Sequence, residues 1–247
     1  MNRKPLNRKA YGSIPHLPNS RMGPADHHCH VGQARIATGK ARDWRDVVIV
    51  TEKLDGSCCS FAKIKGSIFP LTRAGYVANT SPYEQHSMFY EWGKKNYERV
   101  AELLGEGERC VGEWMIQAHG TRYALPHEPF VVFDIIRDEC RIPYHELVGR
   151  CCRLDFVTPK LISYGPPISV EQVLKRIKVS GHGALDEVEG AVWRVERNGC
   201  FDFIVKYVRP DKEDGVYLPS VTGVGPVWNG FAFKPSDQVL RGGGAMK

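Results

Sequence analysis

No run of apolar residues in this 247-residue sequence approaches the length of about 20 that a membrane-spanning helix needs. The basic start, M-N-R-K-P-L-N-R-K, is not followed by the apolar segment of a secretory signal. These two absences argue against a membrane protein and against export. We therefore expect a cytoplasmic protein with no membrane partner.

The eight cysteines lack the spacing of a disulfide scaffold or of a common zinc site. Four of them form two adjacent pairs, at 58–59 and 151–152, and no C-x-x-C occurs. This pattern, without an export signal, predicts reduced thiols.

The chain also lacks a strong excess of one charge. Its net charge of +6 suits a polyanionic partner, because Lys and Arg that neutralise phosphates release counterions. Many proteins without such a partner are equally basic, so charge alone does not decide. The hydrophobic share of 42% and the length fit one large globular domain or two small ones.

The most informative stretch is K-L-D-G, residues 53–56, which follows the apolar run V-V-I-V. A lysine at the end of a buried strand loses hydration, which lowers its pKa, and neighbouring positive charge lowers it further. The neutral amine of Lys53 would then be a nucleophile. Gly56 allows a tight turn and close approach of a ligand, and Asp55 would orient the amine or help to hold a metal. A β-turn with a solvated lysine is the alternative interpretation.

Alternating and β-rich runs predict strands at 47–52, 58–64, 67–72, 110–116, 130–136, 188–196 and 200–208. The last two flank Arg197-Asn198-Gly199, a strong hairpin signal that would place Glu189 and Lys206 in adjacent strands. Helices are expected at 81–104, with Ser81 as N-cap and Pro82 in the first turn, and at 169–179.

Six motifs in fixed order resemble those of the ATP-dependent RNA ligase family, in the covalent nucleotidyltransferase superfamily, and most resemble its phage RNA ligase 2-like branch. They are K-L-D-G at 53–56, Arg73 in L-T-R-A-G, Glu113 in V-G-E-W, Phe133 in F-V-V-F-D-I-I, Glu189 in E-G-A-V and Lys206 in F-I-V-K-Y-V-R. The resemblance covers most of the chain, from about Lys53 to Arg209.

The resemblance implies that Lys53 attacks the α-phosphate of ATP, forming a lysyl-AMP and releasing pyrophosphate. Lys206 would contact the α-phosphate, and Glu189 would anchor Mg²⁺, or Mn²⁺ in its place, directly or through water. Arg73 would bind phosphate or ribose oxygens with its planar fork.

The other implied contacts are to the nucleoside. Glu113 would accept hydrogen bonds from the ribose, Phe133 would stack on the purine, and the backbone of Glu52 would read the edge of the base. Many family members carry a second lysine two residues after the position of Lys206. Here that position is Val208, and Arg209 is the candidate replacement.

The implied fold is α+β, an ATP-grasp-like nucleotidyltransferase domain in which antiparallel sheets enclose a nucleotide cleft with helices outside. We expect an extended segment at 1–45 packed on a catalytic domain at 46–210. The tail at 211–247 would continue the domain and then fray near Gly242-Gly243-Gly244. Only 38 residues follow Arg209 in the sequence, too few for a complete OB domain, so a protein partner would replace a C-terminal domain.

The expected function is repair of RNA by joining 3′-hydroxyl and 5′-phosphate ends, with RNA or an RNA-containing nicked duplex as substrate. A nicked-DNA ligase or an mRNA-capping guanylyltransferase is the alternative with the same chemistry. A nucleic-acid-binding module without catalysis is the alternative from another class.

The stretch Asp26-His27-His28-Cys29-His30 is dense in side chains that bind zinc. Because neighbouring side chains of an extended segment point to opposite faces, they cannot all converge on one ion. A zinc site therefore ranks behind local packing or contact with RNA.

Overall fold

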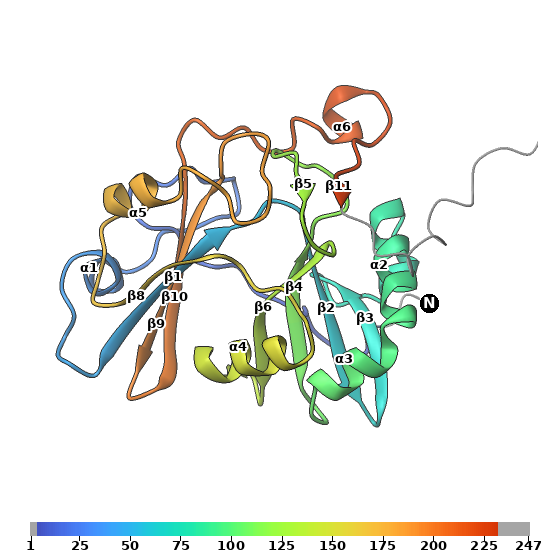
Figure 1. Cartoon of the computed structure of the whole chain (residues 1–247), viewed down its shortest axis with the longest axis horizontal. Helices are drawn as coiled ribbons and strands as arrows, with labels where there is room; N and C mark the ends of the chain where they lie inside the picture. The colour runs from blue at the N-terminus through green and yellow to red at the C-terminus, as the bar shows by residue number, and fades with distance from the viewer. Residues whose placement is uncertain (1–3, 232–247) are drawn as a thin grey trace, which may run out of the picture.

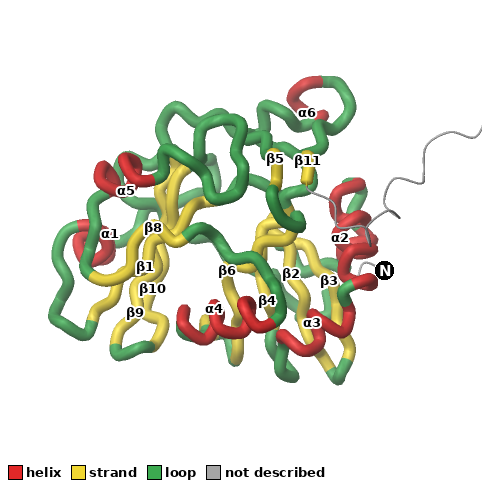
Figure 2. The backbone as a smooth tube through the Cα atoms, in the orientation of Figure 1, coloured by secondary structure: helices red, strands yellow, loops and turns green. Residues whose placement is uncertain are grey.

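The computed structural model describes residues 4–231 and consists of two antiparallel sheets with helices on their outer sides (Figures 1 and 2). The four-stranded sheet has the order β10-β9-β1-β8, and the five-stranded sheet has the order β3-β2-β4-β6-β7. The expected α+β class with antiparallel sheets and outer helices is confirmed.

The four-stranded sheet is built around the apolar run before Lys53. Its strands are β1 (Asp46–Lys53), β8 (Leu161–Gly165), β9 (Gly190–Arg197) and β10 (Cys200–Val208). The hairpin between β9 and β10 turns at Asn198 and Gly199, whose φ angles of 52° and 74° are those that an Asn-Gly turn supplies. The predicted hairpin is therefore confirmed.

The five-stranded sheet contains β2 (Ser57–Ile64), β3 (Ser67–Thr72), β4 (Arg109–Trp114), β6 (Phe130–Arg137) and β7 (Cys140–Arg141). Only three residues, 54–56, separate the end of β1 from the start of β2. The K-L-D-G stretch is therefore the crossing from one sheet to the other. Residues 53–56 would therefore border a cleft between the two sheets.

The helices cover the outer faces. Helices α2 (Glu84–Lys95), α3 (Tyr97–Leu103) and α4 (Tyr144–Arg153) share a core with the five-stranded sheet, to which Phe89, Trp92, Val100 and Leu147 contribute. Helices α1 (Val31–Thr38) and α5 (Val170–Arg176) pack on the four-stranded sheet through Ala34, Ala37 and Val173. Burial of these apolar side chains fixes each helix to its sheet.

The single helix expected at 81–104 is wrong in two respects. The segment forms two helices, α2 and α3, which are divided at Asn96, and a separate 3₁₀ turn (Ala78–Thr80) precedes them. Helix α2 begins at Glu84, so Ser81 is not its N-cap, and the Ser81 hydroxyl instead lies 2.6 Å from His86 Nδ1. Gly93 lies inside α2. Close packing requires a glycine at this position, because a Cβ there would overlap the ring of Phe61.

The segment at 1–45 is not wholly extended, since Val31–Thr38 forms α1. Its extended part pairs with β10: Leu17 N donates to Lys206 O at 2.8 Å, and Lys206 N donates to Pro15 O at 2.9 Å. This pairing brings the N-terminal segment beside the last motif.

After β10 the chain continues through α6 (Pro219–Thr222) to β11 (Gly230–Phe231), which pairs in parallel with β5 (Ala124–Leu125). The glycines at 242–244 lie outside the described residues. Within 4–231, no helix combines the length and apolar character needed to cross a bilayer.

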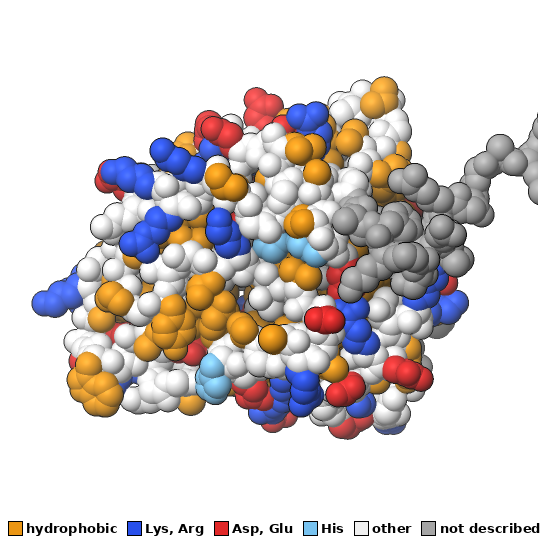
Figure 3. Space-filling model, in the orientation of Figure 1, with side chains coloured by type: hydrophobic (Ala, Val, Ile, Leu, Met, Phe, Trp, Pro, Cys, Tyr) orange, Lys and Arg blue, Asp and Glu red, His pale blue; other side chains and the backbone are white. Residues whose placement is uncertain are grey.

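The space-filling view shows hydrophobic side chains gathered over β8, where Leu161 and Tyr164 are exposed (Figure 3). On this face the basic side chains alternate with acidic ones and do not form one continuous patch (Figure 3). The net positive charge is therefore not concentrated here.

Candidate active site

A cavity of about 620 Å³ lies between the two sheets and contains most of the residues that the motifs predict. The predicted residues that line it are Glu52, Lys53, Asp55, Gly56, Arg73, Glu113, Phe133 and Lys206. Glu189 is joined to this set by its contact with Lys53. The volume is within the usual range for a small-molecule site.

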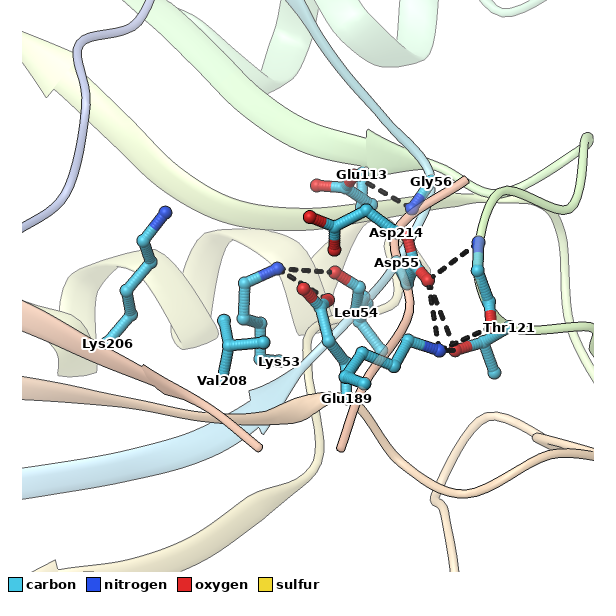
Figure 4. Close-up of polar contacts among 12 residues, drawn as sticks. Lys53, Leu54, Asp55, Gly56, Glu113, Thr121, Glu189, Lys206, Val208 and Asp214 are labelled. Carbon is cyan, nitrogen blue, oxygen red and sulfur yellow. Dashed lines mark hydrogen bonds and ion pairs between the residues drawn. The ribbon is translucent and has the colours of Figure 1, made fainter. Parts of the chain in front are cut away.

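Lys53 ends β1 opposite Gly190, the first residue of β9. Register therefore places Glu189 next to it, and Lys53 Nζ donates to Glu189 Oε2 at 2.5 Å (Figure 4). Burial alone would lower the pKa of Lys53, but the negative charges of Glu189, Glu113 and Asp55 outweigh it and raise this pKa. The expectation of a lowered pKa is wrong for this ligand-free site, because carboxylates and not cations surround the amine.

Asp55 faces the loop that follows β4. Its Oδ2 accepts from Gly120 N at 3.0 Å and from Thr121 Oγ1 at 3.2 Å (Figure 4). Lys212 Nζ lies 3.3 Å from the same oxygen. These contacts fix the carboxylate on the side of the crossing away from Lys53.

Gly56 is required by close packing and not by an unusual backbone angle. A Cβ at this position would lie 2.7 Å from the carbonyl oxygen of Trp114 on β4. The Gly56 N–H donates to Glu113 Oε1 at 3.1 Å. The absent side chain thus lets the crossing approach β4 and orient Glu113.

The two glutamates of the site hold protons more strongly than usual. Burial raises the pKa of Glu113 to about 8, partly offset by Lys53 and reinforced by Glu189 and Asp55. Burial also raises the pKa of Glu189 to about 7, again partly offset by Lys53. The carboxyl groups of Glu113, Glu189 and Asp55 therefore all lie near the single ammonium group of Lys53.

Phe133 lies on β6, with its ring 5.3 Å from that of Tyr11 in an edge-on arrangement. It is half-buried and lines the cavity. Arg73 reaches the same N-terminal segment, donating to Gly12 O at 3.3 Å and to Ser13 Oγ at 3.2 Å. The segment therefore forms one wall of the site.

Glu52 is nearly fully buried and is used structurally by its side chain. Its Oε2 accepts from Gly181 N at 2.8 Å, and its Oε1 accepts from Ser180. The Glu52 N–H donates to Lys160 O at 2.9 Å, so this donor is occupied in the ligand-free site.

Lys206 extends from β10, and Figure 4 shows no contact between it and Lys53. Its Nζ lies 3.5 Å from Asp26 Oδ1, and burial together with the charge of Lys53 lowers its pKa. Asp26 Oδ2 is also 3.2 Å from His16 Nε2. Asp26 had been grouped with the histidine-rich stretch, and its role as the counter-ion of Lys206 was not predicted.

The rest of that stretch is used locally. The imidazole of His30 caps α1, with Nδ1 accepting from Gly32 N at 3.1 Å. His27 O and Cys29 N make backbone hydrogen bonds to His16. Within residues 4–231 no three His, Cys, Asp or Glu side chains gather into a group that could hold a metal, and the contacts of this stretch are those of local packing.

Val208 lies beside Lys53 and pairs in register with Gly190 (Figure 4). Arg209 does not supply the missing cation there, because its guanidinium pairs with Glu187 and lies 3.8 Å from Asp211. The further cation is Lys212, whose amine donates to Gly120 O and Thr121 Oγ1. No spacing rule pointed to Lys212, since it lies in a turn-rich segment beyond the last motif.

Three ion pairs lie at the site. Each lysine is paired with one carboxylate, and Glu113 is in addition to these pairs. The pairs are Lys53 with Glu189, Lys206 with Asp26, and Lys212 with Asp55.

Two comparisons with solved structures support the fold. A mutant of the Naegleria gruberi RNA ligase with ATP and Mn superposes with a TM-score of 0.55 and 14% identity. The Naegleria gruberi RNA ligase with PPi superposes with a TM-score of 0.51 and 14% identity. The matches cover 81% and 79% of this chain but only 56% and 59% of those chains. No curated protein sequence matches this chain.

A family model described as RNA ligase matches residues 46–208, which is more than half of the chain and extends from β1 to the end of β10. It includes every motif residue placed above from Glu52 to Lys206. The chain belongs to the RNA ligase family.

Proposed function

We propose that this chain is an ATP-dependent RNA ligase that joins a 3′-hydroxyl end to a 5′-phosphate end through a lysyl-AMP on Lys53. The observation that carries the proposal is the contact of Lys53 with Glu189 at a cavity also lined by Glu113 and Phe133. The matched Naegleria gruberi RNA ligase mutant contains ATP and Mn, which supports a nucleotide and a divalent cation here.

In the first step the lone pair of Lys53 Nζ forms a bond to the α-phosphorus, and the bond to the bridging oxygen of pyrophosphate breaks. The amine reacts only after its proton, which the surrounding carboxylates hold in place, has passed to solvent water. Lys206 leaves Asp26 and places its positive charge on the α-phosphate. AMP then passes from Lys53 to the RNA 5′-phosphate, and the 3′-hydroxyl displaces it.

The residues fit a divalent cation. The carboxyl groups of Glu189, Glu113 and Asp55 lie around Lys53, so this amine alone does not offset the charge of a triphosphate. Glu189 and Asp55 have the hard oxygen atoms that Mg²⁺ or Mn²⁺ prefers, and Glu189 would hold the ion directly or through water. A bound divalent cation would offset negative charge on the phosphates and on Glu189.

The nucleoside contacts follow from the walls of the cavity. Phe133 offers a ring face for stacking on the adenine. Glu113 accepts a hydrogen bond from the ribose, while its Oε1 also accepts from the Gly56 N–H. Arg73 exchanges its contacts with the N-terminal segment for phosphate or ribose oxygens. Substrates would be RNA or an RNA-containing nicked duplex, with a protein partner able to contribute contacts beyond this chain.

The test is incubation with ATP or GTP labelled on the α-phosphate, with Mg²⁺ or Mn²⁺, followed by a denaturing gel and mass spectrometry. We expect one AMP on Lys53, lost in Lys53→Ala and greatly reduced in Glu189→Ala. Lys94→Ala, an exposed lysine of α2, is the matched control and should label normally.

Sealing of RNA and DNA nicks then separates the remaining functions. Label on Lys53→Ala, or labelling by GTP alone, would contradict the proposal. Faster sealing of all-DNA nicks than of RNA nicks would favour a DNA ligase.

A further inference from the structure

One end of the cavity is lined by hydroxyl and imidazole groups that the mechanism above does not use. They belong to the start of β2, the segment from the 3₁₀ turn into α2, and the loop after β4. The side chains are Ser57, Thr80, Ser81, Tyr83, His86 and His119. We call four of them, Ser57, Ser81, Tyr83 and His86, the His86 surface.

His86 connects two serines. Its Nε2 lies 2.8 Å from Ser57 Oγ, and its Nδ1 lies 2.6 Å from Ser81 Oγ. Burial and the neighbouring His119 lower the pKa of His86 to about 4, so the imidazole is neutral at pH 7. A neutral imidazole has one N–H and one lone pair, so one serine donates to it and the other accepts from it.

This arrangement leaves complementary groups for a ligand. The serine that donates to His86 keeps oxygen lone pairs available, and the serine that accepts from it keeps an O–H available. The surface thus offers one acceptor and one donor with no fixed charge. Such a pair suits the vicinal hydroxyls of a ribose better than it suits a phosphate.

Strand order separates this surface from the base-binding wall. Across the five-stranded sheet, Phe133 is on β6, Glu113 on the adjacent β4, and Ser57 on β2 beyond it. A nucleotide with its base on Phe133 and its ribose on Glu113 directs its phosphate to Lys53 at the crossing between the sheets. The β2 end of the cavity then remains open for a second substrate.

Tyr83 supplies a surface for the base of that substrate. It is 62% exposed, and its ring stands edge-on to that of His86 at 5.7 Å and 88°. An exposed aromatic ring beside groups that bind hydroxyls is a common arrangement for a single-stranded RNA nucleotide.

We propose that the His86 surface binds the 3′-terminal nucleotide of the RNA acceptor, with its ribose diol on Ser57, His86 and Ser81 and its base on Tyr83. This inference rests on the proposed ligase function. It assigns the acceptor end to α2 and the start of β2, outside the motif residues.

The test isolates the final joining step by supplying a 5′-adenylylated RNA donor on a template, beside acceptors that end in ribose or in 2′-deoxyribose. The wild-type chain should seal the ribose acceptor about fivefold faster, the effect of about one hydrogen bond. His86→Ala should raise the KM of the ribose acceptor and reduce this preference to about one, whereas Tyr83→Ala should raise the KM of both acceptors alike and keep the preference. Tyr97→Ala, an exposed tyrosine of α3, is the control that should keep both values.

Labelling of Lys53 with ATP and with 2′-deoxy-ATP distinguishes the acceptor ribose from that of the nucleotide. The variants could change the preference for ATP over 2′-deoxy-ATP in labelling while leaving the ribose preference in joining unchanged. That result would assign the surface to ATP and overturn the inference. So would an unchanged ribose preference in His86→Ala, an unchanged acceptor KM in Tyr83→Ala, or no ribose preference in the wild type. Absence of label in the wild-type chain would instead refute the ligase function and the inference together. Since Tyr83 is exposed, its variant decides even if His86→Ala fails to fold.

Discussion

The amine of Lys212 lies 3.3 Å from Asp55 Oδ2 and joins the C-terminal part of the chain to the K-L-D-G crossing. The side chain of Lys212 is only 5% exposed and that of Asp55 only 15%. The same amine donates to Gly120 O and Thr121 Oγ1. Lys212 therefore fixes Asp55 and the loop after β4 together.

Replacing Lys212 by methionine should destabilise the chain and slow the adenylylation of Lys53. The change leaves a mostly buried carboxylate at Asp55 without its cation, which typically costs about 3 kcal/mol. Urea unfolding measures the loss, and transfer of labelled AMP measures the rate. Lys175→Met is the matched control, because its pair with Glu171 is fully at the surface and should contribute less than about 0.5 kcal/mol. Equal unfolding midpoints for Lys212→Met and the wild type would contradict this role.

The raised pKa of Glu113 predicts a stability that falls as pH rises. The folded chain binds a proton at this carboxyl up to about pH 8, whereas the unfolded chain releases it near its ordinary value of 4.5. Between these values the folded state holds more protons, so the free energy of unfolding decreases with pH. Glu113→Gln removes this contribution and should gain up to about 4 kcal/mol relative to the wild type from pH 5 to pH 8.

Urea unfolding at pH 5, 6, 7 and 8 tests this expectation. Glu189, with a pKa of about 7, adds a slope of the same sign that remains in the variant. Glu102→Gln, at an exposed position of α3, should run parallel to the wild type. Parallel curves for Glu113→Gln would show that its carboxyl is not protonated in the folded chain.

Lys206 and Asp26 should respond differently to substitution. Lys206→Ala removes a positive charge from the proposed α-phosphate site and should slow adenylylation by at least about tenfold. Asp26→Asn breaks the same ion pair but retains the lysine, so its effect should be smaller. Rates of AMP transfer at saturating and limiting ATP compare the two variants. If both lose activity equally, the ion pair and not the phosphate contact explains the effect of Lys206→Ala.

Local sequence determined the strands that carry the site. The apolar run before Lys53 and the Asn-Gly turn after β9 specify their structures through burial and backbone angles within a few residues. Helix α4 and strand β8 were not predicted from the sequence. Leu147 and Cys151 of α4 are buried one helical turn apart, an amphipathic spacing that the sequence reasoning missed, whereas β8 is an edge strand with Leu161 and Tyr164 exposed and shows no clear alternation.

The motif order in the sequence predicted which residues would gather around Lys53, but their electrostatics depend on tertiary structure. Glu189 is 136 residues away and reaches Lys53 through pairing of β1 with β9, and its charge reverses the expected pKa shift. Asp26 and Lys212 join the site through the N-terminal and C-terminal segments, where no sequence period marks them. Sequence thus determined the types of reacting groups and the strands that hold them. Tertiary structure decided their charge states, because a pKa depends on every charge within several ångströms, whatever its place in the chain.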